Sequence, residues 1–307
     1  MYPFGMSLSA TPLEQTFGAI LDKVPRLRNR VGISELSGGL TNRNLKVLTA
    51  DSAYVARISS NESNLLSIDR ASEYKNSIIA AEAGIGAPVY DYLPSDGLLV
   101  IGFLPGRTYV SADVGNNITR IAESVKKLHQ APPFVRDFDM FEVQENYLSI
   151  VKNRGFRIPD NYEDFQIFRD ELFAAFSSTH DGTVPCNNDL LPANFIDDGT
   201  KVWLIDYEYS GNNDACFELG NIWSESGLPI EALQKLVSAY YGEDRPDKFA
   251  RAWLFSVLAK YGWTLWASIQ DGISELDFDF WSWGMKKYAD VQNDFGSQFY
   301  RTQIANL

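Results

Sequence analysis

Three oxygen-bearing side chains stand close together in the second half of the chain. Asp189 is followed by Asn194, and Asp206 comes directly after a short apolar run. A tight loop followed by a hairpin would direct all three side chains to one place. Mg²⁺ prefers oxygen ligands in octahedral geometry, and a carboxylate can accept the proton of an attacking hydroxyl group. The spacing predicts phosphoryl transfer, with Asp189 as the base and Asn194 and Asp206 holding magnesium against nucleotide phosphates.

The alternative is that these residues only form turns, because Asn, Asp and Pro are common between strands for conformational reasons. An Asp and an Asn at this spacing are a weak signal when they stand alone. Here they are followed by a strand and by the segment Ile205-Asp206-Tyr207-Glu208-Tyr209. That combination favours the chemical interpretation over the turn interpretation.

The residues before this loop predict a sheet, and those around it predict helices. Thr11-Pro12-Leu13-Glu14 is typical of a capped helix start. Pro105-Gly106 interrupts the pattern and is a candidate hinge, after which helical spacing dominates. We expect an α+β fold with residues 1–104 and 105–307 as its two parts. The first part should contain five short strands, at 33–36, 45–49, 54–58, 88–93 and 98–103, and one long helix at 65–83.

Composition limits the partners. The 307 residues are 45% hydrophobic and carry a net charge of −13, which argues against nucleic acid and anionic membranes and is compatible with a small cation. No stretch is apolar enough to span a bilayer, and the N-terminus does not resemble a signal peptide. The two cysteines, Cys186 and Cys216, fit a reducing compartment. We therefore expect a cytoplasmic protein.

On its motifs the chain resembles the choline/ethanolamine kinases, within the aminoglycoside-phosphotransferase-like and protein-kinase-like superfamily. It is especially similar to bacterial choline kinases that supply phosphocholine for surface polymers. The resemblance extends over nearly the whole chain and implies a bilobal fold, with a small five-stranded antiparallel lobe and a mostly helical lobe. It rests on the Asp189 loop and on four segments: SGGLTN at 37–42, IDRASE at 68–73, IDYEYS at 205–210 and WTLWASIQ at 263–270.

The resemblance also implies an ATP site with Mg²⁺. The loop containing Gly38, Gly39, Thr41 and Asn42 would cover the phosphates, since glycines let backbone N–H groups approach an anion. Four further residues are assigned by the resemblance. Arg57 is the expected cation for the phosphates, and Glu73 is the acid that would orient it. Phe103 is expected near the adenine ring, and Glu208 is an additional acid at the metal.

The chain departs from the family at one position. The family usually has His two residues before the catalytic Asp, where this chain has Asn187. That His is thought to brace the loop, and because an Asn side chain also donates and accepts hydrogen bonds, we expect activity to be retained. The two histidines of the chain, His129 and His180, are interpreted as structural.

Aromatic residues indicate the acceptor. Five of the seven tryptophans follow Arg251. A quaternary ammonium has no N–H to donate and binds best to aromatic faces with an acid nearby. Helical spacing alone would favour a core role for these rings. The resemblance nevertheless assigns a choline pocket to Trp263, Trp266, Trp283 and Glu225.

Other acceptors and one other class of protein stay open. Ethanolamine is hard to exclude, and thiamine or an aminoglycoside is conceivable, although several ammonium groups would require several acids. A nucleotide- or choline-binding protein with little turnover is favoured only by Asn187, and the retained Asp189, Asn194 and Asp206 argue against it. A monomer and a homodimer are equally compatible with the sequence.

Overall fold

The computed structural model describes residues 11–36, 41–59 and 63–307. The chain divides into two compact units. One comprises Met1–Asn61 and Pro88–Phe103 and is called the sheet unit here; the other comprises Glu62–Ala87 and Leu104–Leu307 and is called the helical unit. Residues 62–87 belong to the helical unit by their contacts, whereas the sequence analysis placed them in the first part. The boundary at residue 104 remains a prediction.

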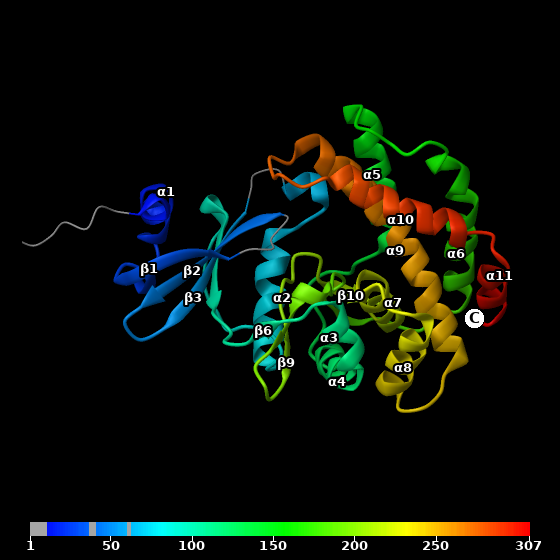
Figure 1. The fold of residues 1–307 in the computed structure, drawn as a ribbon, viewed down its shortest axis with the longest axis horizontal. Helices are drawn as coiled ribbons and strands as arrows, with labels where there is room; N and C mark the ends of the chain where they lie inside the picture. The colour runs from blue at the N-terminus through cyan, green and yellow to red at the C-terminus, as the bar shows by residue number, and fades with distance from the viewer. Residues whose placement is uncertain (1–10, 37–40, 60–62) are drawn as a thin grey trace, which may run out of the picture. The chain divides into compact units, whose positions relative to one another are not determined.

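The sheet unit contains the predicted five-stranded antiparallel sheet (Figure 1). The strands are ordered β1-β2-β3-β5-β4, so β3 lies at the centre and carries Arg57 opposite Asn44 on one side and Leu99 on the other. Arg57 is therefore on the central strand of the sheet. The bounds are β1 Arg30–Leu36, β2 Asn42–Thr49, β3 Ala53–Ser59, β4 Val89–Leu93 and β5 Leu98–Gly102.

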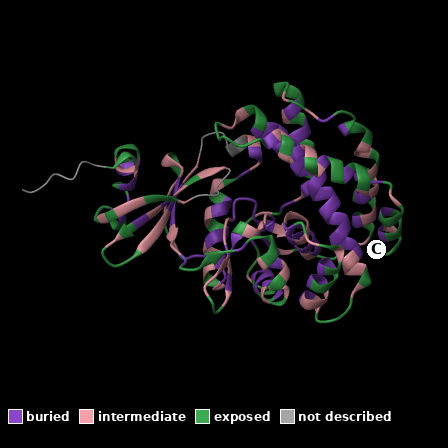
Figure 2. Ribbon diagram, viewed as in Figure 1, coloured by how far each residue is buried: buried purple, intermediate pink, exposed green. Residues whose placement is uncertain are grey.

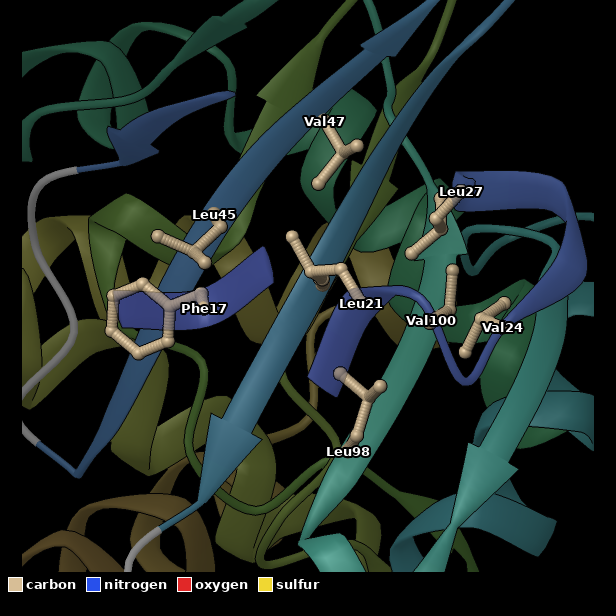
Figure 3. Packing of buried hydrophobic residues seen from close by; sticks show 9 residues of the cluster. Phe17, Leu21, Val24, Leu27, Leu45, Val47, Leu98 and Val100 are labelled. Atoms are coloured by element: carbon tan, nitrogen blue, oxygen red, sulfur yellow. The ribbon is translucent and has the colours of Figure 1, made fainter. Parts of the chain in front are cut away.

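An N-terminal helix, α1 (Pro12–Leu21), covers this sheet. The Thr11 hydroxyl accepts a hydrogen bond from the Glu14 N–H at 3.2 Å, which confirms the predicted helix start. Apolar side chains of α1 and the segment after it meet those of β2, β3 and β5 (Figure 3). Burying such side chains contributes about 1.5–3 kcal/mol each. The cluster comprises Phe17, Leu21, Val24, Leu27, Leu45, Val47, Ala56, Leu98 and Val100.

The helix predicted for residues 65–83 is shorter than expected. A 3-10 turn, η2 (Ser63–Leu66), precedes it, and α2 runs from Arg70 to Glu82. Ser67 has a left-handed backbone, with φ of 59°, and the Asp69 carboxylate caps α2 by accepting from the N–H groups of Ala71 and Ser72. The helix therefore begins directly after its cap, Asp69, and the apolar residues before Asp69 are not part of it.

The rest of the helical unit alternates helices with two small sheets. One sheet pairs β7 (Val184–Cys186) with β10 (Gly211–Asn213), and the other has the order β6-β8-β9, with β6 Arg107–Thr108, β8 Phe195–Asp197 and β9 Val202–Leu204. The remaining helices are α3 Ser111–Asn116, α4 Ile118–His129, α5 Met140–Arg154, α6 Gln166–Ser178, α7 Ala215–Glu225, α8 Ile230–Tyr241, α9 Pro246–Ile273, α10 Phe280–Asp294 and α11 Gln298–Ala305.

The long helix α9 forms the centre of the helical unit. It packs against α5, α7, α10 and α11, and it is buried continuously from Ala250 to Gln270 (Figures 1 and 2). A helix that is surrounded on all sides by others needs apolar residues on every face. Across the described ranges, no helix combines the length and the apolar character needed to cross a bilayer.

The crossing of α7 and α9 depends on a glycine, and its substitution is our first prediction. A Cβ added at Gly220 would lie 2.0 Å from the Ala252 carbonyl oxygen. We expect Gly220→Ala to lower the free energy of unfolding by about 2–3 kcal/mol, measured by urea denaturation. Gly115→Ala is the control, since its methyl meets only the end of the Leu228 side chain at 3.2 Å. Equal stability of the two variants would contradict this view of the crossing.

Candidate active site

The loop after β7 is held by a buried asparagine. Asn188 has a left-handed backbone with φ of 67°, a conformation that Asn adopts more readily than most residues. Its amide donates to the Tyr209 carbonyl at 3.0 Å and accepts from Asn213 Nδ2 at 2.9 Å. These bonds connect the loop to the segment that leads into β10, and they fix the position at which Asp189 follows.

The next residues form a hairpin that carries two of the predicted metal ligands, Asn194 and Asp206. Asn194 Nδ2 donates to the Asp189 carbonyl at 2.7 Å, which orients the amide so that its Oδ1 can serve as a ligand. The Ile205 N–H donates to the Asn194 carbonyl at 3.0 Å, and β8 pairs with β9. Asp206 follows at once with φ of 65°, a left-handed backbone two residues after the end of β9. The hairpin thus places the Asn194 backbone beside that of Ile205, the residue that precedes Asp206.

Asn187 connects the two halves of this arrangement. Its Nδ2 donates to the carbonyls of Ile205 and Asp206 at 3.1 and 2.8 Å. Its Oδ1 accepts from the Asp189 N–H at 3.1 Å. One side chain therefore links the loop that carries Asp189 to the segment after β9 that carries Asp206, through both the donor and the acceptor of the amide.

A buried histidine, His129, is linked to the same loop through Glu218. His129 Nε2 lies 2.7 Å from Glu218 Oε2, and its Nδ1 lies 2.8 Å from the Tyr240 hydroxyl. Glu218 Oε1 accepts from the Asn187 N–H at 2.9 Å. His129 thus has a structural place in the fold. His180 Nδ1 accepts from the Gly182 N–H at 3.1 Å.

The site is strongly acidic. Burial raises the pKa of the Asp189 carboxyl well above its ordinary value, and the negative charges of Asp206, Glu208 and Glu225 raise it further, while Lys287 acts in the opposite direction. A divalent cation would offset the negative charge that such carboxylates concentrate around Asp189. The oxygen-bearing side chains therefore fit Mg²⁺, and Asn194, Asp206 and Glu208 are the residues that would hold it.

Glu208 also forms an ion pair with an arginine of α2. Arg70 Nη1 lies 2.7 Å from Glu73 Oε2 and 3.2 Å from Glu208 Oε2. This arginine, near the start of α2, connects the helix to the segment after Asp206. The acid predicted to orient the phosphate cation, Glu73, is thus joined through Arg70 to the acid predicted near the metal.

The predicted acceptor residues form one aromatic cluster with two contributions that the sequence analysis missed. The Trp266 ring centroid lies 5.5 Å from that of Trp283, and Trp266 Nε1 donates to the Tyr209 hydroxyl at 2.9 Å. Tyr209 also meets Trp263 edge to face at 5.1 Å. Lys287 Nζ lies 4.3 Å from the Trp283 ring centroid and pairs with Glu225.

Both omissions had a signal in the sequence. Tyr209 stands in the segment used for the resemblance, but no role was given to it. Lys287 follows Trp283 at a spacing that places both on one face of a helix. Burial raises the pKa of Tyr209 well above its ordinary value, so its hydroxyl keeps its proton.

The family model for choline/ethanolamine kinases matches residues 33–235. The chain belongs to this family. Protein LicA of Haemophilus influenzae is 29% identical over 212 residues, which are 66% of this chain and 61% of LicA. The chain thus spans less than two thirds of that relative. Ethanolamine kinase 1 of Mus musculus is 24% identical over 301 residues, covering 84% of this chain and 82% of the relative.

A solved structure agrees over nearly the whole length. A choline/ethanolamine kinase family protein from Mesorhizobium loti matches with a TM-score of 0.84 and 26% identity, covering 96% of this chain and 98% of that one. The kinase-like fold that the motifs predicted is thereby confirmed. The matched range contains the Asp189 loop and the segments at 37–42, 68–73 and 205–210, whereas the segment at 263–270 lies outside it.

The nucleotide residues expected from this kinase family lie mostly in the sheet unit. Gly38 and Gly39 lie outside the described residues. Asn42 begins β2, and its Nδ2 donates to Thr41 Oγ1 at 3.0 Å. Arg57 on β3 is 6% exposed. Their roles toward ATP remain predictions.

Phe103, the expected neighbour of the adenine ring, directly follows β5. Its N–H donates to the Ala53 carbonyl at 3.1 Å, so this backbone donor already serves the sheet. Lys46 Nζ lies 3.7 Å from the Phe103 ring centroid. An adenine ring near Phe103 would therefore contact an aromatic ring that already has the Lys46 ammonium group over its face.

Proposed function

We propose that the protein transfers the γ-phosphoryl group of ATP to the hydroxyl group of choline, forming phosphocholine and ADP. Membership of the choline/ethanolamine kinase family supports phosphorylation of a small amino alcohol. The observation that carries the choice of choline is the cluster of Trp266 and Trp283, with Glu225 close to Trp283 through Lys287. Aromatic faces with an acid nearby suit one compact quaternary ammonium group.

Asp189 is the proposed base. It orients the choline hydroxyl group and accepts its proton as the oxygen forms a bond to the γ-phosphorus and the bond to ADP breaks. Mg²⁺, when held by Asn194 and Asp206, neutralises charge on the phosphates. Asn187 holds Asp189 and the segment after β9 in place through its three hydrogen bonds. Most of the rate enhancement then comes from positioning and from charge neutralisation.

Ethanolamine is the second candidate. Ethanolamine kinase 1 of Mus musculus matches 84% of this chain. The primary ammonium group of ethanolamine needs hydrogen-bond acceptors, and the Glu225 carboxylate beside the aromatic cluster would supply one. Both candidates use the same catalytic residues and differ only in how the ammonium group is held.

The test is ADP release by the purified protein with Mg-ATP and choline, ethanolamine, thiamine or kanamycin. We expect kcat/KM for choline to exceed that for ethanolamine at least about tenfold, equivalent to about 1.4 kcal/mol of discrimination. A preference for ethanolamine would keep the kinase and reject the quaternary-ammonium site. No release of ADP with any acceptor would contradict the proposal.

The brace formed by Asn187 gives a further prediction. Asn187→Ala removes the donor for the Ile205 and Asp206 carbonyls and the acceptor for the Asp189 N–H. We expect kcat to fall at least about tenfold, with KM for ATP nearly unchanged, because a displaced base slows the chemical step more than binding. Steady-state kinetics checks this result.

The control for the Asn187 variant is Asn153→Ala. Asn153 is exposed on α5, and its amide donates only to Ser149 Oγ among the described contacts, at 3.2 Å. That variant should keep the wild-type kcat. If Asn187→Ala also keeps it, the amide has no part in positioning the loop.

A further inference from the structure

The ammonium group of Lys287 lies where a cationic ligand would be expected to bind. Its Nζ pairs with Glu225 Oε1 and lies 4.3 Å from the Trp283 ring centroid. The side chains of Lys287 and Glu225 are only 12% and 7% exposed. The proposed cation subsite, an acid beside a tryptophan face, therefore already contains a positive charge that belongs to the protein.

Two helices produce this arrangement. Trp283 and Lys287 are one turn apart on α10, so they share a face. Glu225 is the last residue of α7, where the helix dipole adds partial negative charge. The carboxylate, the ring face and the helix end all attract a cation, and none of them distinguishes the ammonium group of lysine from that of a ligand.

The pair also lies close to the proposed base. The charges of Glu225 and Lys287 both act on the Asp189 carboxyl, in opposite directions. An acceptor whose hydroxyl group reaches Asp189 would bring its ammonium group into the neighbourhood of this ion pair. Two positive charges would then compete for one carboxylate, since like charges repel strongly in a water-poor surrounding.

We propose that Lys287 is a tethered competitor for the acceptor. In the ligand-free protein its ammonium group occupies the cation subsite formed by Glu225 and Trp283, and the acceptor binds by displacing it. This inference rests on the proposed function for the identity of the acceptor. The lysine stem is long and flexible enough to release the carboxylate. The apparent affinity for the acceptor is reduced by the fraction of molecules in which Lys287 occupies the subsite.

The probe is tetramethylammonium, which has the cationic group of choline but no hydroxyl group to phosphorylate. Its Kd is measured by isothermal titration calorimetry for the wild type and for Lys287→Met. We expect Lys287→Met to bind about tenfold more tightly, because the carboxylate loses its internal partner. Lys287→Arg, which keeps the charge, should bind less tightly than Lys287→Met.

Two controls separate this effect from a change in net charge. Lys286→Met removes the same charge from an exposed neighbour on α10 and should leave Kd within about twofold of the wild type. Lys287→Met combined with Glu225→Gln should lose the tenfold gain. Binding by Lys287→Met that is equal to or weaker than that of the wild type would overturn the proposal and assign Lys287 to holding Glu225 in place.

A measurement on the unaltered protein keeps the proposal testable if Lys287→Met fails to fold. Acetic anhydride labels exposed lysines, and mass spectrometry reports the labelling of Lys287 relative to Lys286. We expect tetramethylammonium to increase labelling of Lys287, because displacement exposes its ammonium group. Unchanged or reduced labelling would overturn the proposal. Neither measurement requires turnover, so both results stand apart from the outcome with choline and ATP.

Discussion

Replacing Asp189 with Asn lowers kcat at least about 10³-fold, because the variant cannot accept the proton of the attacking hydroxyl group. The substitution keeps the size and the planar shape of the side chain. The loop is held by other groups, since the Asp189 carbonyl accepts from Asn194 and the Asp189 N–H donates to Asn187. Binding of Mg-ATP should therefore change less than about threefold. Single-turnover kinetics and nucleotide titration check the two halves of this expectation.

The matched control for Asp189→Asn is Asp290→Asn. Asp290 is exposed on α10, and its substitution makes the same change of charge outside the acidic site. We expect wild-type kcat from this variant. If Asp189→Asn retained more than about a tenth of the wild-type kcat, the proton would have to leave by another route, and the proposed role of Asp189 would be wrong.

Replacing Asp206 with Asn raises the Mg²⁺ concentration needed for half-maximal activity at least about tenfold and lowers kcat at least about 10²-fold. Asn is the appropriate replacement because Asp206 has φ of 65°, and Asn tolerates the left-handed region that most side chains avoid. The backbone that accepts from Asn187 is therefore kept while one negative charge is lost.

Mg²⁺ titrations at fixed ATP distinguish this variant from Asp189→Asn. The Asp189 variant should lose kcat with little change in its Mg²⁺ requirement, because Asp189 is proposed as a base and Asp206 as a metal ligand. A normal Mg²⁺ requirement in Asp206→Asn would contradict the assignment of Asp206 to the metal.

The sequence predicted the sheet well because its signals are local. Short apolar runs separated by turn residues locate the strands, and the capping threonine at residue 11 locates the start of α1. The prediction failed at residues 65–69, where apolar residues favoured a helix. There the cap by Asp69 and the left-handed Ser67 determine the structure. A capping side chain can determine where a helix begins even when the apolar residues before it follow helical spacing.

The sequence indicated a candidate site where its residues are close in the chain. Asp189, Asn194 and Asp206 are separated by one loop and one hairpin, and their roles stay predictions. The pairing of Lys287 with Glu225 was not predicted, because it depends on how α7 and α10 both pack against α9. Contacts between distant segments follow from tertiary packing, which a single sequence does not reveal through periodicity.

The family assignment and the acidic site together support our proposal that this chain phosphorylates the hydroxyl group of choline. The most direct measurement is ³¹P NMR of a reaction containing the purified protein, Mg-ATP and choline. We expect a phosphomonoester resonance matching phosphocholine to grow as the γ-phosphate resonance of ATP disappears, and we expect neither change with Asp189→Asn. Loss of ATP with formation of inorganic phosphate alone, or equal phosphocholine formation by Asp189→Asn, would contradict it.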